Sequence, residues 1–243
     1  MNPPPSIWLA VDAVVFGYSP KQDILVLLIQ RKYPPFQDKW ALPGGFIGDS
    51  ESLEEAVSRE LEEETGVKVQ YLEQLYTFGK PDRDPRRRVI SVAYYALVRP
   101  DAFELNPQTD ASDAQWFSLN ELPELAFDHP SILRQAINRL RSKITYEPIG
   151  FELLDESFTF AELFHLYKSI LGPVIDQEKG IEKRNFKKKF LRLGLLEELG
   201  EKRKHAGSGR PAQLYRFNQK RYQELLEEGG AFMSIWIPST PRG

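Results

Sequence analysis

The segment from residue 43 to residue 67 reads PGGFIGDSESLEEAVSRELEEETGV, and it places eight acidic residues directly behind two glycines. From Ser52 to Thr65 the apolar residues recur at helical spacing, and Gly66 stands where a glycine commonly ends a helix. Two interpretations are open for so acidic a helix. It is either an ordinary solvated face or a site that holds a strongly positive group.

Helical phasing separates these carboxylates into two sets. At about 100° per residue, positions 54, 55 and 62 lie on the polar side, as expected of a solvated face. The opposite stripe begins with apolar residues at 53, 56 and 57 and continues with Glu60, Glu63 and Glu64. Carboxylates spaced i, i+3 and i+4 on a packing stripe repel each other unless a cation lies among them. The phasing therefore favours a site for a hard divalent ion such as Mg²⁺.

The same residues carry a family resemblance. Five residues separate Gly45 from Glu51, and seven separate Glu51 from the run RELEEETGV at 59–67, a pattern that resembles the Nudix box at every defined position. The resemblance implies an α/β/α sandwich and hydrolysis of a nucleoside diphosphate linked to another moiety. It also implies metal ligation, by Mg²⁺ or alternatively Mn²⁺, through three glutamates and a backbone carbonyl near the glycines. The implied residues are Glu60, Glu63, Glu64 and Gly44 as metal ligands, with Arg59 as a further catalytic residue.

Two roles around the box stay open at this stage. Arg59 and Glu51 carry opposite charges and could pair to brace the loop against the helix. The general base is either Glu60 or a carboxylate outside the box, because members of the resembled family differ in this respect.

Composition limits the class of protein. The chain has 243 residues, of which 41% are hydrophobic, and it contains no cysteine, so disulfides, thiolate metal sites and a cysteine nucleophile are excluded. No apolar run reaches the roughly 18 residues of a membrane span. We expect a cytoplasmic protein with no membrane partner. His129, His165 and His205 are too scattered to suggest a metal triad and are interpreted as structural or exposed.

The order of strands and helices predicts an α/β domain over residues 1–147. Strands are expected at 7–16, 24–31, 39–46, 67–79 and 88–98. The stretch 114–125 is read as a strand, a turn and a short helix, and 129–144 as an amphipathic helix.

The loop KPDRDPRRR at 80–88 carries four arginines, whose guanidinium groups suit phosphate recognition. The alternative is an exposed charged hairpin. Pro81, 15 residues after Gly66, resembles the ADP-ribose branch of Nudix enzymes, which implies ADP-ribose or a related dinucleotide as the substrate. The candidate substrate-binding residues are Arg31, Gly45, Phe46, Arg83 and Arg86.

The C-terminal part differs in charge. Residues 178–222 hold 14 Lys and Arg against five Asp and Glu, a surplus of nine, whereas the whole chain has a net charge of −3. Helices are expected at 158–172, capped by Ser157 or Thr159 and closed by Gly172, and at 181–194, followed by two strands around a basic loop. This pattern predicts a small winged-helix (α+β) domain over 148–228, with a tail at 229–243.

The second of these helices places basic residues on its outer face above an apolar inner face, as a helix in a DNA major groove requires. The alternative is a basic surface helix that aids solubility or docks on the acidic domain. The segment 151–222 resembles the winged helix of Nudix-related regulators of NAD metabolism, which implies an ADP-ribose sensor on duplex DNA. Many of those regulators have a degraded box, and the intact box here favours retained catalysis. A homodimer is expected for paired half-sites. The candidate DNA-binding residues are Lys183, Arg184, Lys187, Lys188 and Arg210.

Overall fold

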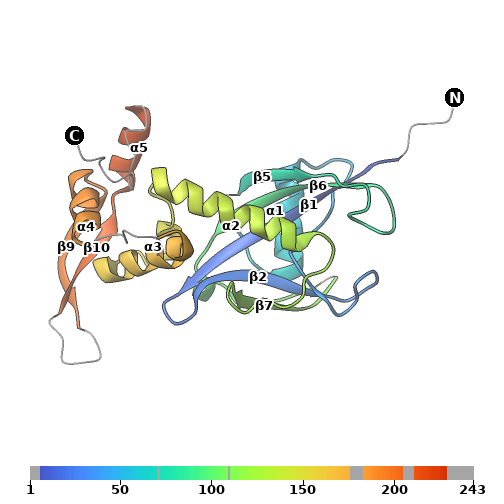
Figure 1. Ribbon diagram of the computed structural model, residues 1–243, viewed down its shortest axis with the longest axis horizontal. Coiled ribbons are helices and arrows are strands. Elements are labelled where there is room, and N and C mark those ends of the chain that lie inside the picture. The colour runs from blue at the N-terminus through green and yellow to red at the C-terminus, as the bar shows by residue number, and fades with distance from the viewer. Residues whose placement is uncertain (1–5, 70–71, 109, 176–182, 205–210, 229–243) are drawn as a thin grey trace. The chain divides into compact units, whose positions relative to one another are not determined.

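The computed structural model describes residues 6–69, 72–108, 110–175, 183–204 and 211–228 (Figure 1). The predicted tail at 229–243 and Arg210 lie outside the described residues. The chain forms two compact units, Met1–Arg139 and Leu140–Gly243, and the division falls within helix α2 (His129–Tyr146).

The first unit is built on a seven-stranded sheet in the order β3-β2-β1-β6-β5, with β4 paired to β1 and β7 paired to β2. β1 and β6 run parallel, and the other pairs are antiparallel. The strands are β1 (Trp8–Ser19), β2 (Asp23–Arg31), β3 (Trp40–Ala41), β4 (Gly44–Phe46), β5 (Glu73–Phe78), β6 (Val89–Leu97) and β7 (Ala111–Ser118).

Helices cover both faces of this sheet, with α1 (Leu53–Thr65) behind the strands and α2 in front of them in the view of Figure 1. Successive side chains of β1 point to opposite faces of the sheet. Val11, Ala13 and Val15 pack with Ala56 and Leu61 of α1, whereas the side chain of Asp12 lies beside His129 at the start of α2. The predicted α/β/α sandwich is confirmed. A short 3-10 helix, η1 (Pro100–Ala102), follows β6.

Three local predictions for this unit differ from the structure. Among the described residues of the strand expected at 67–79 only β5 forms, and the strand expected at 39–46 is divided into β3 and β4. The short helix expected before residue 125 does not form. The Ala126 N–H donates to the Trp40 carbonyl, and Leu125 bridges to Trp40, so this segment runs extended beside β3.

In its described residues the second unit contains the end of α2, a three-stranded sheet in the order β8-β10-β9 and the helices α3, α4 and α5. The elements are the 3-10 helix η2 (Phe151–Leu153), β8 (Phe158–Thr159), α3 (Phe160–Ile175), α4 (Lys183–Arg192), β9 (Leu196–Arg203), β10 (Ala212–Phe217) and α5 (Gln219–Glu227). In its core Tyr167 of α3 packs against Phe186 and Phe190 of α4. Phe151 of η2 contacts Phe190 and stacks on Phe217 of β10. The predicted winged helix is confirmed.

Details of the second unit refine the prediction. Thr159 caps α3, because its Oγ1 accepts from the Glu162 N–H at 3.2 Å while the Glu162 carboxylate accepts from the Thr159 N–H at 2.6 Å. The prediction that Gly172 closes this helix is wrong. Gly172 does not take the left-handed backbone with which a glycine ends a helix, and α3 continues to Ile175. Helix α5 was not predicted. Among the described residues no helix has the length and apolarity to cross a membrane.

Candidate functional site

Helix α1 is fixed at both ends by its own sequence. The Ser52 hydroxyl accepts from the Glu55 N–H at 3.2 Å, and the Glu55 carboxylate accepts from the Ser52 N–H at 2.7 Å, which completes a capping box. At the other end Gly66 has φ 77° and donates to the Glu62 carbonyl. The face predicted to be solvated is exposed, and Glu54 on that face also accepts from the Tyr94 hydroxyl at 2.9 Å. These contacts fix both ends of α1 and the face that it turns to solvent.

The pairing of Arg59 with Glu51 is confirmed. Arg59 Nε and Nη2 donate to the two oxygens of Glu51 at 3.0 and 2.7 Å, and Nη2 also donates to the Phe46 carbonyl at 3.2 Å. The hydrogen bonds that Glu51 accepts from Arg59 and from the Gly48 N–H lower the pKa of its carboxyl to about 2. The loop that precedes α1 is thus tied to the middle of the helix.

The three glutamates of the predicted metal site occupy different environments. Glu64 is buried, with Oε2 accepting from the Gly44 N–H at 2.8 Å. Glu60 accepts from Arg59 Nη1 at 2.8 Å, whereas Glu63 is 41% exposed and lies 3.5 Å from the same nitrogen. Burial raises the pKa of Glu60, and it raises the pKa of Glu64 well above its ordinary value. Burial therefore disfavours the negative charge of Glu60 and Glu64.

The carboxylates of Glu60, Glu63 and Glu64 are oxygen donors of the kind that bind a divalent metal ion. In the part of the chain that the structure describes, no three acidic or histidine side chains already converge on a common metal position. The reason lies in the contacts above, because Glu64 points to Gly44 and the Arg59 guanidinium lies between Glu60 and Glu63. Clustered carboxylates with burial-raised pKa values are stabilised by a nearby cation, and oxygen ligands of this type suit Mg²⁺.

The two glycines permit close approaches on two sides of β4, Gly44 to β1 and Gly45 to the Glu60 side chain of α1. A Cβ on Gly44 would lie 2.2 Å from the Val11 carbonyl oxygen, across the pairing of β4 with β1. A Cβ on Gly45 would lie 2.2 Å from Oε1 of Glu60. A side chain at position 45 would therefore move Glu60, while a side chain at position 44 would disturb the sheet.

Arg31 and Arg86 lie close enough to repel each other, and Arg31 also interacts electrostatically with Glu64. Arg31 is half-buried, donates to the Pro35 carbonyl at 2.9 Å and lies 4.9 Å from the centre of the Phe127 ring. Burial lowers the pKa of Arg31, and repulsion by Arg86 lowers it further. Arg86 pairs with Asp84 at 2.7 Å and lies 5.8 Å from the centre of the Phe46 ring. Two arginines that repel each other favour an anion between them.

Asp110 belongs to the same electrostatic neighbourhood and was missed by the sequence reasoning. Its charge contributes to raising the pKa of both Glu60 and Glu64, and it acts on Arg31 as well. The residue lies just before β7 and outside any motif, so nothing in the sequence marks it. It is a carboxylate outside the box of the kind considered for the general base.

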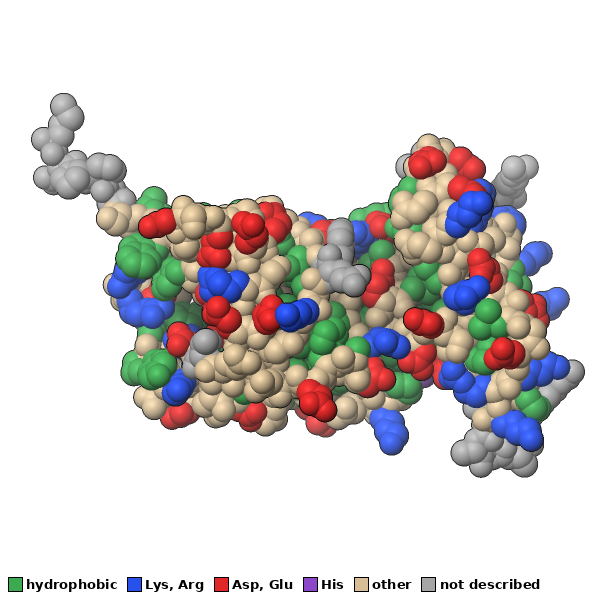
Figure 2. Space-filling view, turned by 180° about the vertical axis from the view of Figure 1, so that it is seen from behind, with side chains coloured by type: hydrophobic (Ala, Val, Ile, Leu, Met, Phe, Trp, Pro, Cys, Tyr) green, Lys and Arg blue, Asp and Glu red, His purple; other side chains and the backbone are tan. Residues whose placement is uncertain are grey.

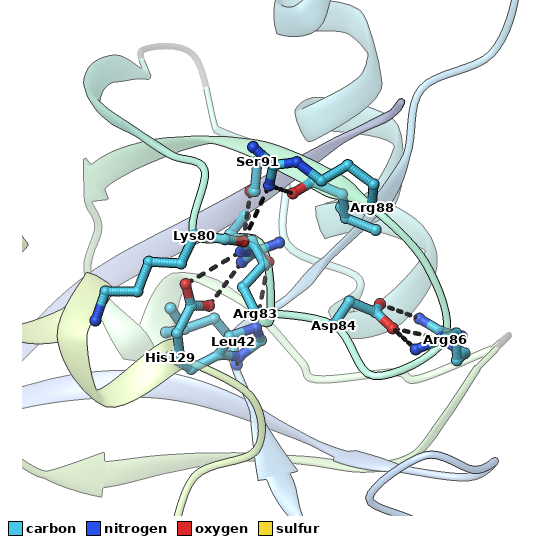
Figure 3. Close-up of polar contacts among 11 residues, drawn as sticks. Leu42, Lys80, Arg83, Asp84, Arg86, Arg88, Ser91 and His129 are labelled. Atoms are coloured by element: carbon cyan, nitrogen blue, oxygen red, sulfur yellow. Dashed lines mark hydrogen bonds and ion pairs between the residues drawn. The ribbon is translucent and has the colours of Figure 1, made fainter. Parts of the chain in front are cut away.

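Arg83 does not extend from the loop as a free side chain. Its guanidinium is buried and donates to Asp12 Oδ2 at 3.1 Å and to both oxygens of Asp128, at 2.8 and 3.1 Å (Figure 3). The Ser91 hydroxyl donates to the same oxygen of Asp12. The network ties the loop 80–88 to β1, β6 and the start of α2. The only signal for it in the sequence is Asp12, a charged residue inside the apolar run 8–16.

His129 completes this network in a fixed tautomer. Its Nδ1 accepts from the Leu42 N–H at 2.9 Å, so the proton resides on Nε2, which lies 3.5 Å from Asp12 Oδ1 (Figure 3). Burial lowers the pKa of His129, partly offset by Asp12 and reinforced by Arg83. The histidine is structural, as expected, and neutral in the folded protein near neutral pH.

The lowered pKa of His129 predicts a pH dependence of folding. Below pH ~6.5 the unfolded chain binds a proton that the folded chain does not, so the free energy of unfolding falls as pH decreases, by up to about 1.4 kcal/mol per pH unit. His129→Gln, which keeps an acceptor for the Leu42 N–H, is expected to remove this component. Urea unfolding of both proteins between pH 7.5 and 5.5 measures it, and parallel pH profiles would contradict the assignment.

The second unit presents a basic groove beside α4. Phe186 and Phe190 face the core, while Lys183, Arg184 and Lys188 are exposed. Lys187 lies 5.7 Å from the centre of the Phe160 ring at the start of α3 and 5.3 Å from the centre of the Tyr215 ring of β10. These four basic residues of α4 and both of these rings line an open cavity of about 720 Å³. Lys and Arg side chains also gather on the surface of this unit, at the right of Figure 2.

The comparisons with known proteins agree with both units. The NUDIX domain family matches residues 8–139, and the NrtR DNA-binding winged helix domain matches residues 150–217. The ADPR responsive transcriptional repressor NtrR of Acinetobacter baylyi is 36% identical over 90% of this chain and 85% of its own length. The ADP-ribose pyrophosphatase of Methanocaldococcus jannaschii is 43% identical over 52% of this chain and 70% of its own.

A solved structure extends the likeness to the whole fold. The crystal structure of Shewanella oneidensis NrtR complexed with a 27mer DNA has a TM-score of 0.74 and 38% identity, and the match covers 88% of this chain and 95% of that one. This protein therefore belongs to the Nudix family and carries a C-terminal winged helix of the NrtR type.

Proposed function

We propose that the N-terminal unit hydrolyses the pyrophosphate of ADP-ribose with Mg²⁺, or alternatively Mn²⁺, and that the C-terminal unit binds duplex DNA. The observation that carries the first part is the position of two glutamates: Glu64 is buried beside Gly44, and the partly buried Glu60 lies beside Gly45. Arg31 interacts electrostatically with Glu64. The similarity to an ADP-ribose pyrophosphatase and to an ADPR responsive repressor supports the choice of ligand.

The metal-binding residues in this proposal are Glu60, Glu63, Glu64 and the Gly44 carbonyl. A bound Mg²⁺ would polarise the pyrophosphate and lower the pKa of an attacking water. Arg59 holds Glu60 and the preceding loop in place through its bonds to Glu51 and Phe46. Asp110 and Glu60 are the two carboxylates proposed as candidates for accepting the proton of that water.

The phosphates are assigned to Arg31 and Arg86, whose positive charges repel each other in the absence of an anion. Gly45 and Phe46 form the adjacent strand, where Phe46 lies under the Arg86 guanidinium. Arg83, buried between Asp12 and Asp128, supports the substrate site by anchoring the loop that carries Arg86.

The test is incubation of the full chain with ADP-ribose and Mg²⁺, with AMP as the product measured. A panel of nucleoside diphosphate compounds run in parallel establishes the substrate class. Absence of turnover with every member of the panel would refute the hydrolase. Saturable binding of ADP-ribose without turnover, measured by calorimetry, would leave a ligand sensor as the function of this unit.

Gly45→Ala is expected to separate activity from stability. The added Cβ would meet the Glu60 carboxylate, which is the end of a flexible side chain, so the fold can accommodate it by moving Glu60. Hydrolysis should fall by about 10- to 100-fold, as when the residues that orient a metal ligand are removed. Thermal unfolding should change little. Full activity would remove Glu60 from the proposed site.

A specific observation favours the DNA-binding part. The groove beside α4 is lined by the predicted residues Lys183, Arg184, Lys187 and Lys188, in a unit that matches a DNA-binding winged helix. Arg210, which lies outside the described residues, remains a proposed contact. We propose a homodimer on paired half-sites, and a domain boundary at 147/148, after α2 has ended.

Sequence-selective DNA binding is tested by selection from a random duplex pool with the full chain, followed by gel shifts with and without ADP-ribose. Binding that responds to ADP-ribose supports a regulator whose signal can be ended by hydrolysis. Binding without sequence preference would refute the regulator. Light scattering of the free chain and of the complex measures the proposed dimer.

A further inference from the structure

The outer face of α4 contains one apolar residue among its basic ones. Phe186 and Phe190 point to the core. At about 100° per residue, Arg184, Lys188 and Leu191 fall on the opposite side of the helix. Leu191 is 43% exposed and lines the same groove as Lys183, Arg184, Lys187 and Lys188. A leucine in this position is not used by the core of the winged helix.

The charge around Leu191 selects the kind of surface that can cover it. Four basic side chains border the groove, so a second copy of this helix would meet like charges, which oppose association. Duplex DNA supplies the opposite charge along both edges of its major groove. Between those edges the groove is lined by hydrogen-bonding groups and by one apolar group, the C5-methyl of thymine.

We propose that Leu191 is a sequence-reading residue, whose side chain packs against a thymine methyl group while the neighbouring basic residues bind the phosphates and base edges. This inference rests on the proposed binding of DNA and adds to it a specific base. The basic residues provide affinity for DNA of any sequence, and Leu191 provides discrimination at one base pair.

The experiment removes the methyl group from the DNA and the side chain from the protein. The probe is the duplex selected by the full chain from a random pool, with each thymine replaced in turn by deoxyuridine. At one position in each half-site, replacement of thymine by deoxyuridine should weaken binding of the wild-type chain by about fourfold. This is the value expected for the loss of one buried methyl group, about fourfold. Leu191→Ala should bind both probes alike at that position.

Lys188→Gln is the matched control on the same face. It should weaken binding to the thymine and uracil probes by the same factor, so the ratio between them is retained. Thermal unfolding of Leu191→Ala, whose side chain lies outside the core, verifies that the variant is folded.

Two results would overturn the inference while DNA binding stands. One is a wild-type chain for which no thymine-to-uracil replacement weakens binding. The other is a Leu191→Ala chain that discriminates the two probes as the wild type does. Failure to select any DNA sequence would instead refute the proposed DNA binding, and the inference with it.

Discussion

Arg83→Met is expected to lower the free energy of unfolding of the N-terminal unit by about 3–5 kcal/mol, the usual cost of breaking a buried ion pair from one side. The Arg83 side chain is 6% exposed, and its removal leaves Asp12 and Asp128 buried together without their counter-charge. Methionine retains much of the apolar stem, so the loss reports chiefly on charge. Urea unfolding followed by tryptophan fluorescence measures it, since Trp8, Trp40 and Trp116 belong to this unit.

Arg87→Met is the matched control from the same loop. Arg87 is exposed and lies 4.0 Å from the centre of the Trp8 ring, a contact worth less than about 1 kcal/mol at an exposed site. Asp12→Asn provides a second control, because it should destabilise the wild type but recover stability in the Arg83→Met background. Equal losses for Arg83→Met and Arg87→Met would show that the network does not hold the loop.

The parts of the fold that could be predicted are those determined by neighbouring residues, such as helix caps and the spacing of apolar side chains. Ser52, Glu55 and Gly66 define both ends of α1, and alternation or continuous apolarity marks β1, β2 and β6. The phasing that placed Glu60 and Glu64 on the packing stripe needed only the helical period. The pairing of Glu51 with Arg59 could be predicted because their charges are opposite and one precedes the helix while the other lies within it.

What could not be predicted depends on contacts between distant segments. Arg83 was read as a phosphate ligand because a loop rich in arginine suggests exposure, and its carboxylate partners lie 71 and 45 positions away in the chain. Asp110 approaches the glutamates only because β7 pairs with β2. Helix α3 passes Gly172 because a glycine ends a helix only when its backbone turns left-handed, which composition alone does not reveal.

The environment of Glu64 leads to the strongest prediction for activity. Glu64→Gln should reduce Mg²⁺-dependent hydrolysis of ADP-ribose by more than about a hundredfold, because even residues that merely orient a metal ligand cost 10- to 100-fold when removed. The amide oxygen of glutamine can still accept from the Gly44 N–H, so the geometry of β4 is retained. The measurements are the rate of AMP formation and the melting temperature of the same preparation.

Glu62→Gln is the control for this substitution on the same helix. Glu62 is exposed and pairs with Lys68 at 2.7 Å, away from the packing stripe, so its change should leave both activity and melting temperature close to the wild type. Because Glu64 is buried beside another carboxylate, its replacement by a neutral residue should not lower the stability of the metal-free protein. A Glu64→Gln chain that melts earlier and loses activity in proportion would mean that Glu64 serves the fold, whereas an intact fold without hydrolysis assigns it to the metal site.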